Sequence, residues 1–267
     1  MAEPRPTLCA AIIAKNEERN LPRCLRSVRW ADEIVLVDDC STDRTPDIAR
    51  EFGCTVITNP LRDFSDQRNL ALRHCTSEWV FHIDADEECP PALRDEILGV
   101  IRNTSFSGFR VPCRNRFLGQ PMRCRDWAMT RPLRLARRET SRWVRPVHEI
   151  LETEHPVGDL QSPLDHFGEA DYAARVLKSN LYSSLEAGLL AARGRRFSTW
   201  CLLALPLFRA LRSYFLAGGW RDGVRGVFWA GHVWWGNFTI HLKLWELEQA
   251  GTQGGAAGSP GGPCRDR

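Results

Sequence analysis

Two groups of acidic residues are the first candidates for chemistry in this chain. Asp38 and Asp39 form one group, and Asp84-Ala85-Asp86, followed by Glu87 and Glu88, forms the other. Adjacent carboxylates repel each other unless water or a cation neutralises them, and hard oxygen ligands favour Mg²⁺ or Mn²⁺. A metal held in this way keeps positions for the phosphate oxygens of a substrate. The alternative is a solvated acidic turn that caps the next helix.

Other chemical motifs are incomplete. His148-Glu149 starts an H-E-x-x-H pattern, but Glu152 stands where a zinc site of this type needs its second histidine. The ten cysteines are scattered without a C-x-x-C pair, which argues against a zinc cluster. The sequence has no P-loop pattern and no G-x-G-x-x-G after a strand, so kinase-type and dinucleotide-binding functions lack support.

The acidic groups follow short apolar runs that are typical of buried strands. We expect strands over residues 8–14, 34–37, 55–58 and 79–83, and helices over residues 17–28, 46–52, 66–74 and about 90–103. Strands that alternate with helices at this spacing predict a parallel sheet. Ligands of open α/β sheets bind at the carboxyl ends of the strands, which share one edge. We therefore expect both acidic groups to lie at the same edge.

The pattern changes in the second half of the chain. Residues 108–167 alternate short apolar stretches with Arg, Pro and Gly, which predicts antiparallel strands and long loops. From residue 171 the apolar spacing is helical, with further helices expected over residues 197–217, bent near Pro206, and about 221–249. We predict a catalytic α/β domain over residues 1–168, a helical region over residues 169–250 and a disordered tail over residues 251–267.

The first part of the chain resembles family 2 glycosyltransferases, which share the GT-A fold. Three segments match in order: residues 11–17 (AIIAKNE), residues 37–45 (VDDCSTDRT), and Arg68-Asn69 followed by the strand that ends at Asp84-Ala85-Asp86. The joint pattern is far more specific than any one segment. The resemblance implies a Rossmann-like, mostly parallel sheet with helices on both faces, plus a C-terminal helical extension.

The resemblance also implies roles in binding a nucleotide sugar. Asp39 would accept a hydrogen bond from the ring N–H of a uracil-type base. Glu17 and the backbone near Ala14 would line the same pocket, and Arg68 would lie near the base or the diphosphate. For Asp38 we instead expect a turn role, because aspartate side chains bond to local backbone groups.

The same resemblance assigns the metal. Asp84 would contact the ribose or the metal, and Asp86 would be the direct ligand of Mg²⁺ or Mn²⁺. A cation at this position would neutralise the charge that develops on the leaving diphosphate.

Residues 145–149 (RPVHE) resemble the V-H-E element of lipopolysaccharide inner-core β-1,4-glucosyltransferases and their relatives. An inverting transfer needs a base that deprotonates the acceptor hydroxyl, and a carboxylate does this in related glycosyl chemistry. Glu149 is our candidate base, and His148 would orient it or contact phosphate. The competing carboxylates are Asp126, Glu152 and Asp165. The resemblance implies UDP-glucose as donor and a lipopolysaccharide-type glycan or glycolipid as acceptor.

Composition restricts the partners less than the motifs do. The net charge is only +3, and we expect no nucleic-acid partner. Because residues 1–6 lack the features of a signal peptide, we expect a cytoplasmic chain with reduced thiols.

The apolar run over residues 200–208 is too short to span a membrane. The tryptophans and arginines around it suit either helix packing or peripheral contact with the inner face of the cytoplasmic membrane.

Two other functions compete with sugar transfer. A nucleotidyltransferase would share acidic strand ends, but it typically has a Gly-rich, basic phosphate loop after the first strand, where this chain has residues 14–17 (AKNE). A non-catalytic, membrane-associated binding module would have less need of the acidic triplet and of Glu149.

Overall fold

The computed structural model describes residues 5–117, 119–145, 149–154, 156–168 and 172–256. The chain forms two compact units. The α/β unit comprises residues 1–122 and 127–170, and the helical unit comprises residues 123–126 and 171–267. The short segment 123–126, which belongs to the helical unit although it interrupts the α/β unit, was not foreseen from the sequence.

A seven-stranded sheet forms the centre of the α/β unit, with the strand order β13-β6-β10-β4-β1-β2-β3. Strands β3, β2, β1 and β4 are parallel, β10 is antiparallel to β4 and β6, and β13 is parallel to β6. The strands are β1 (Leu8–Ala14), β2 (Glu33–Asp38), β3 (Thr55–Thr58), β4 (Trp79–His82), β6 (Gly108–Arg110), β10 (Leu133–Arg137) and β13 (Val157–Asp159). The predicted α/β fold with a mostly parallel sheet is confirmed.

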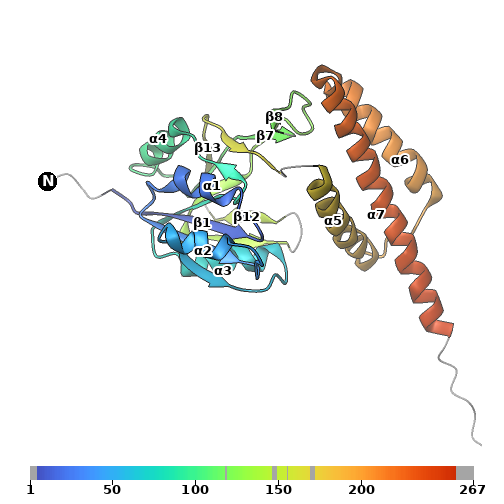
Figure 1. Cartoon of the computed structure of the whole chain (residues 1–267), viewed down its shortest axis with the longest axis horizontal. Coiled ribbons are helices and arrows are strands. Elements are labelled where there is room, and N and C mark those ends of the chain that lie inside the picture. Colours follow the sequence, from blue (N-terminus) through green and yellow to red (C-terminus); the bar gives the residue numbers. More distant parts are fainter. Residues whose placement is uncertain (1–4, 118, 146–148, 155, 169–171, 257–267) are drawn as a thin grey trace, which may run out of the picture. The chain divides into compact units, whose positions relative to one another are not determined.

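Helices cover both faces of this sheet. They are α1 (Leu21–Val28), α2 (Thr45–Glu51), α3 (Phe64–His74) and α4 (Pro91–Val100), and a short 3₁₀ turn, η1 (Arg138–Thr140), follows β10. Alternate side chains of β1 point to opposite faces. Ala10 and Ile12 pack with apolar side chains of α1, α2 and α4, whereas Cys9 and Ala11 pack with side chains of α3. Figure 1 shows α1 and α4 on one side of β1 and α3 on the other.

The ends of two helices differ from the sequence-based expectation for local reasons. The helix expected from residue 17 begins at Leu21, because the preceding residues form a turn in which the Asn20 N–H donates to the Glu17 carbonyl. Helix α3 begins two residues earlier than expected, because the Asp63 side chain caps it by accepting a hydrogen bond from the Asp66 N–H.

Short strands form the rest of the α/β unit; residues 108–167 were expected to form antiparallel strands, and most pairs are antiparallel, but β14 pairs with β7 and β13 with β6 in parallel. Strands β5, β14, β7 and β8 are neighbours in that order, and β9 pairs with β7. Their bounds are β5 (Glu87–Glu88), β7 (Cys113–Phe117), β8 (Gln120–Pro121), β9 (Met129–Thr130) and β14 (Leu164–His166); a hairpin adds β11 (Ser141–Val144) and β12 (Ile150–Thr153). The pairing of β14 with β5 places His166 opposite Glu87.

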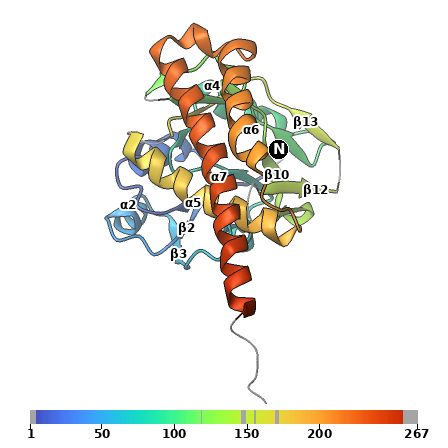
Figure 2. The same ribbon diagram turned by 90° about the vertical axis from the view of Figure 1, so that its right-hand side faces the viewer.

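The described residues of the helical unit form three long helices and two short helical turns. They are α5 (Tyr172–Ala192), α6 (Thr199–Leu211), the π-helical turn η2 (Arg212–Leu216), the 3₁₀ turn η3 (Gly219–Asp222) and α7 (Val224–Ala256). Helix α7 packs against both α5 and α6 (Figure 2). Helix α6 contains Pro206 and ends earlier than expected. Helix α7 continues into the segment expected to be a tail, whereas residues 257–267 lie outside the described residues.

No helix within the described parts of the chain is long and apolar enough to cross a membrane.

Candidate functional site

The loops that follow β1 and β2 are tied together at the carboxyl edge of the sheet. The Asn16 side-chain oxygen accepts a hydrogen bond from the Thr42 N–H over 2.8 Å, and the Asn16 N–H donates to the Ser41 hydroxyl over 2.8 Å. Asn16 has a left-handed backbone with φ of 54°, which asparagine tolerates better than most residues. The Glu17 N–H donates to Thr45 Oγ1 over 2.7 Å, which places Glu17 in the same linked pair of loops.

Asp39 lies at the centre of these loops. Its N–H donates to the Ala14 carbonyl over 2.8 Å, so the two residues predicted to line the base pocket are neighbours. Its carboxylate accepts a hydrogen bond from the Leu61 N–H over 2.8 Å and pairs with Lys15 Nζ at 2.8 Å. The Lys15 side chain is well exposed, so it can move away from Asp39 when a ligand approaches. Asp38 accepts a hydrogen bond from the Ser41 N–H, which is the turn role expected for it.

Asp84, the first carboxylate of the triplet, lies between two buried arginines. Arg68 Nη2 donates to Asp84 Oδ1 over 2.7 Å, and Arg134 Nη2 donates to Asp84 Oδ2 over 2.9 Å. Burial alone would raise the pKa of Asp84, but the guanidiniums of Arg134 and Arg68 hold it well below its usual value. Asp84 is therefore a permanent anion that fixes two cations at the strand end, and both of its oxygens are engaged by arginine.

Glu87 adds a carboxylate to this network that is more deeply buried than Asp84. Glu87 Oε1 accepts a hydrogen bond from Arg134 Nη2 over 2.9 Å, and Glu87 Oε2 accepts one from the Asp84 N–H over 2.7 Å. Burial raises the pKa of Glu87 to about 7, although Arg134 opposes the shift. Arg134 comes from the antiparallel strand β10, and its role was not predicted from the sequence.

Asp86, the last carboxylate of the triplet, faces a histidine. Asp86 Oδ2 lies 3.2 Å from His166 Nε2, and His166 Nδ1 lies 2.7 Å from Asn115 Oδ1. The Asn115 amide nitrogen donates to the Trp127 carbonyl over 2.6 Å, so its oxygen must accept from His166 Nδ1–H. Burial alone would lower the pKa of His166, but the Asp86 carboxylate raises it to about 9.

This geometry fits a divalent cation between Asp86 and His166. In the free protein the Nε2 proton of His166 lies between the ring and Asp86; a cation that replaced this proton would find Nδ1 protonated and held by Asn115, and the lone pair of Nε2 directed towards Asp86. A histidine whose second ring nitrogen is fixed by a hydrogen bond is the usual arrangement for a metal ligand. Carboxylate oxygen and imidazole nitrogen form a mixed donor set that suits Mn²⁺ better than Mg²⁺, which prefers oxygen alone. His166 was not predicted as a site residue, because only the neighbouring Asp165 stood out as a carboxylate.

Glu149 reaches the same network from the end of the β11–β12 connection. Glu149 Oε1 accepts a hydrogen bond from Arg68 Nε over 2.9 Å, so Arg68 joins Glu149 to Asp84. The guanidinium of Arg68 also lies 4.7 Å from the centre of the Trp143 ring, which further fixes its position. His148, predicted to act with Glu149, lies outside the described residues.

The three competing carboxylates are placed elsewhere. Asp165 accepts two hydrogen bonds from Arg114, over 2.6 and 3.0 Å, on the strand β14 that also carries His166. Glu152 lies 3.6 Å from Arg142 in an exposed pair on the hairpin. Asp126 belongs to the helical unit, where it pairs with Arg212 at 3.0 Å. None of these three contacts Arg68 or Asp84 among the interactions of the described residues, whereas Glu149 does.

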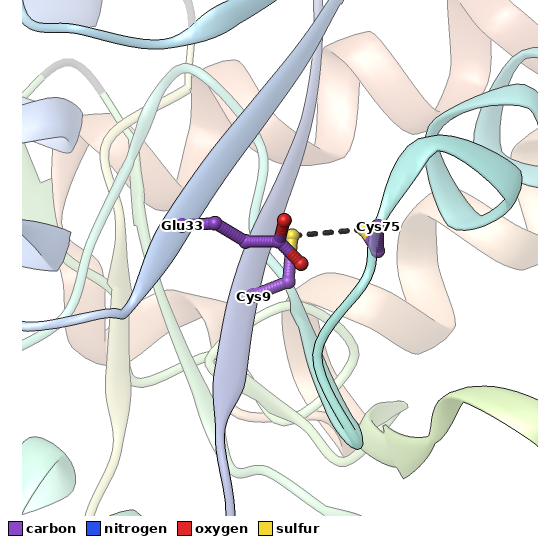
Figure 3. Close-up of side chains that lie close together, drawn as sticks. All are labelled: Cys9, Glu33 and Cys75. Carbon is purple, nitrogen blue, oxygen red and sulfur yellow. Dashed lines mark hydrogen bonds between the residues drawn. The ribbon is translucent and has the colours of Figure 1, made fainter.

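A separate group of possible metal ligands lies at the opposite, amino edge of the sheet. Cys9, Glu33 and Cys75 have ligand atoms within 4.8 Å of one another, and Figure 3 shows the two sulfurs facing each other. Their polar atoms already have protein partners. The Cys9 thiol donates to Cys75 Sγ, the Cys75 thiol donates to the Ala71 carbonyl, and the Glu33 carboxylate accepts from the Thr76 and Ser77 N–H groups. The group is therefore explained as packing and loop capping.

The candidate active site thus lies at the carboxyl edge of the parallel strands. Strands β2 and β4 are the two neighbours of β1, so the acidic residues that follow them lie on either side of Ala14. Arg68, Asp84 and Glu149 form one linked set, and Asp86 with His166 forms the adjoining candidate metal site. Such a site can bind an anionic ligand, hold a cation beside it and present a carboxylate to a second substrate.

Comparison with known proteins agrees with the family resemblance of the sequence motifs. The family described as Glycosyl transferase family 2 matches residues 9–148. The lipopolysaccharide core biosynthesis glycosyltransferase LpsC of Rhizobium meliloti is 34% identical over 234 residues, which cover 84% of this chain and 86% of LpsC.

The solved structure of one mannosyltransferase supports the fold. The mannosyltransferase PcManGT of Pyrobaculum calidifontis, solved in complex with GDP-Man and Mn²⁺, superposes with a TM-score of 0.51 at 16% identity and covers 91% of this chain and 88% of that one. S. aureus TarS 1–349 matches with a TM-score of 0.37 at 22% identity over 45% of this chain. This chain spans 39% of that structure. The resemblance found in the sequence is confirmed: this chain is a glycosyltransferase of the GT-A fold and belongs to family 2.

Proposed function

We propose that this glycosyltransferase transfers glucose from UDP-glucose, with inversion and with the help of a divalent cation, to a hydroxyl of a lipopolysaccharide-type core glycan or glycolipid. The observation that carries the proposal is the continuous network from Glu149 through Arg68 to Asp84, beside the facing pair Asp86 and His166. The family assignment removes the support for a nucleotidyltransferase and for a non-catalytic binding module.

Asp86 and His166 would hold the cation, with Mn²⁺ as the better fit to their mixed oxygen and nitrogen donors. The cation would supply a positive charge to the diphosphate as it leaves. PcManGT, which shares the fold, was solved with GDP-Man and Mn²⁺, and this supports a nucleotide-sugar and metal site of the same kind here. Asn115 would keep the proton on Nδ1 of His166, so that Nε2 would be the ring nitrogen that binds the metal.

Asp39, Glu17 and the Ala14 backbone would receive the nucleoside, and Arg68 and Asp84 would lie beside the ribose and the diphosphate. The exposed Lys15 pairs with Asp39 in the free protein and can turn towards a phosphate once the base takes its place. Each of Arg68 and Arg134 is held by two carboxylates, so their guanidiniums are already fixed in place when an anionic donor binds.

Glu149 would act as the base for the acceptor hydroxyl. Its carboxylate accepts a hydrogen bond from Arg68 Nε over 2.9 Å, which fixes its position beside Asp84. The similarity to LpsC supports a lipopolysaccharide core acceptor, and such an acceptor would place the enzyme in the cytoplasm at the inner face of the cytoplasmic membrane.

The metal site can be tested by thermal shift with UDP-glucose, with and without Mn²⁺. A ligand that binds the native state raises its melting temperature. At a hundredfold excess over the dissociation constant, the free energy of unfolding increases by about 2.7 kcal/mol. We expect Asp86→Ala and His166→Gln to remove the additional shift that Mn²⁺ gives. Asp95→Ala, an exposed carboxylate on α4, is the matched control. A full Mn²⁺-dependent shift in both site variants would refute this metal site.

The base can be tested by turnover. Glu149→Gln keeps an oxygen that accepts from Arg68, so donor binding should remain while the transfer rate falls by about 10²- to 10⁴-fold. Glu152→Gln changes the exposed carboxylate of the same hairpin and should keep the normal rate. If Glu149→Gln retains a near-normal rate, another group is the base.

A further inference from the structure

Helix α6 of the helical unit carries a row of exposed apolar side chains. Trp200, Leu203, Leu207, Phe208 and Leu211, here called the α6 face, expose 76%, 60%, 52%, 61% and 48% of their surface. Four of them recur at spacings of three or four residues, so they lie along one side of the helix. Phe215 and Leu216, which are 61% and 68% exposed, continue the apolar surface into η2. Single exposed apolar residues are ordinary, but a contiguous row of this size marks an interaction surface.

The other side of α6 is accounted for by packing within the unit. Pro206 and Ala210 are buried, and α6 packs along α7. The α6 face is therefore left over after the helical unit has formed its own core. Helix α6 has 13 residues and is about 20 Å long, which gives an extended, narrow apolar strip.

The chain segment that carries this strip has ionised side chains of one sign. Residues 193–221 contain six arginines and no aspartate or glutamate. Arg193, Arg195 and Arg196 precede α6, are exposed, and have no ion pair with a carboxylate among the described residues. At the other end of the strip Arg212 pairs with Asp126, and Arg221 lies over the Trp220 ring, with 5.4 Å between the guanidinium carbon and the ring centre.

We infer that the α6 face docks on the surface of a lipid bilayer that carries anionic headgroups. An amphipathic helix that lies in the interface buries its apolar side among the acyl chains and places its basic residues at the phosphates. Tryptophan at the edge of the strip suits this position, because its ring is apolar and its N–H is polar. A second copy of the chain is a poorer occupant, since pairing two α6 faces would bring the arginines of both copies together, and the segment that carries them contains no aspartate or glutamate.

The inference complements the proposed sugar transfer but does not depend on it. A bilayer-bound helical unit would keep the enzyme at the surface where a glycolipid acceptor is found. Binding to vesicles can be measured without donor, metal or turnover. Failure of docking would therefore leave the proposed chemistry intact, and failure of the chemistry would leave the docking intact.

The test is vesicle flotation of the full chain, with phosphatidylcholine alone and with about one third phosphatidylglycerol. The variant Leu203→Glu/Leu207→Glu introduces two charges on the α6 face. The matched control is Leu177→Glu/Leu181→Glu, which changes two exposed leucines at the same spacing on α5. Because all four side chains are exposed, circular dichroism and thermal unfolding should show both variants folded.

We expect the wild type to float with the anionic vesicles, and Leu203→Glu/Leu207→Glu to bind them at least about tenfold more weakly while the control binds normally. Arg195→Ser/Arg196→Ser should lose about tenfold in affinity for the anionic vesicles and little for neutral ones. Equal flotation of wild type and Leu203→Glu/Leu207→Glu, or absence of wild-type binding, would overturn the inference. A wild-type dimer that this variant dissociates in sedimentation velocity, without vesicle binding, would assign the face to a second copy.

Discussion

Arg134 shows how a single side chain joins the parts of the site. One of its guanidinium nitrogens, Nη2, donates to both Asp84 and Glu87, two neighbouring carboxylates that would otherwise repel each other. A buried ion pair adds little net stability compared with apolar packing, but removal of one partner leaves a buried charge without compensation. The main effect of losing Arg134 would therefore be to leave the charge of its carboxylate partners without compensation.

We expect Arg134→Met to destabilise the protein by roughly 3 kcal/mol or more at neutral pH. Asp84 would keep only Arg68, and the pKa of Glu87 would rise further, because the cation that lowers it would be gone. Urea unfolding followed by circular dichroism measures the loss. Arg142→Met breaks an exposed pair with Glu152 and should change stability by no more than about 0.5 kcal/mol. Equal effects of the two substitutions would contradict the role assigned to Arg134.

The sequence identified those site residues that belong to short local motifs. Asp39 and the triplet at Asp84 stand next to recognisable strands, so their edge of the sheet could be predicted. Arg134 and His166 could not be assigned, because their partners are 50 and 80 residues away and depend on how β10 and β14 pair. Arg134 looked like one of many arginines in its region, and periodicity contains no information about long-range pairing.

At the level of the elements, the parallel half of the sheet followed from the sequence. Strands β1 to β4 are apolar runs separated by helices, and a parallel arrangement is the common solution for that pattern. The insertion of β10 between β4 and β6, and the parallel pairing of β13 with β6, could not be read from the sequence. These strands are three to five residues long, and their order is set by side-chain packing across the sheet.

Glu33, at the start of β2, stabilises the turn between α3 and β4. Partial burial alone would raise its pKa, but hydrogen bonds from the Ser77 and Thr76 N–H groups lower it below the usual 4.5. A carboxyl whose pKa is lowered by folding contributes stability above its unfolded pKa and loses it as the pH falls through the folded value.

We therefore expect Glu33→Gln to be less stable than wild type by about 1 kcal/mol at pH 7. The difference should shrink as the pH falls below 4.5 and through the lowered pKa of Glu33, because Glu33 of the wild type then becomes protonated as well. Urea unfolding of both proteins at several pH values measures this. A difference that stays constant with pH would show that the charge of Glu33 has no part in the effect.

At the scale of the whole molecule, the segment 123–126 is integrated into the helical unit. Asp222, which is buried, accepts hydrogen bonds from the Arg123 N–H and the Cys124 N–H, both over 2.9 Å. The Arg125 N–H donates to the Ala217 carbonyl over 2.8 Å. The backbone of this segment is thus hydrogen-bonded to the η2–η3 region, although the two are nearly a hundred residues apart in the sequence.

We expect Asp222→Asn to weaken this attachment by about 1–3 kcal/mol, because one carboxylate oxygen is replaced by an amide group that cannot accept from a backbone N–H. Hydrogen exchange measures it directly: the amides of Arg123 and Cys124 should exchange faster, while those of β1 and β4 keep their protection. Unchanged exchange at both amides would show that Asp222 does not hold the segment.

The chain passes between its two units three times, after residues 122, 126 and 170, and this limits how the enzyme can be dissected. A shortened protein that stops near residue 170 would retain residues 123–126 but lose Asp222 and Ala217, which satisfy their backbone amides. If such a fragment lost activity, the cause could be either the absence of the helices or the unsatisfied backbone amides of residues 123–126. The contribution of the helices is therefore better measured in the intact chain, one surface side chain at a time.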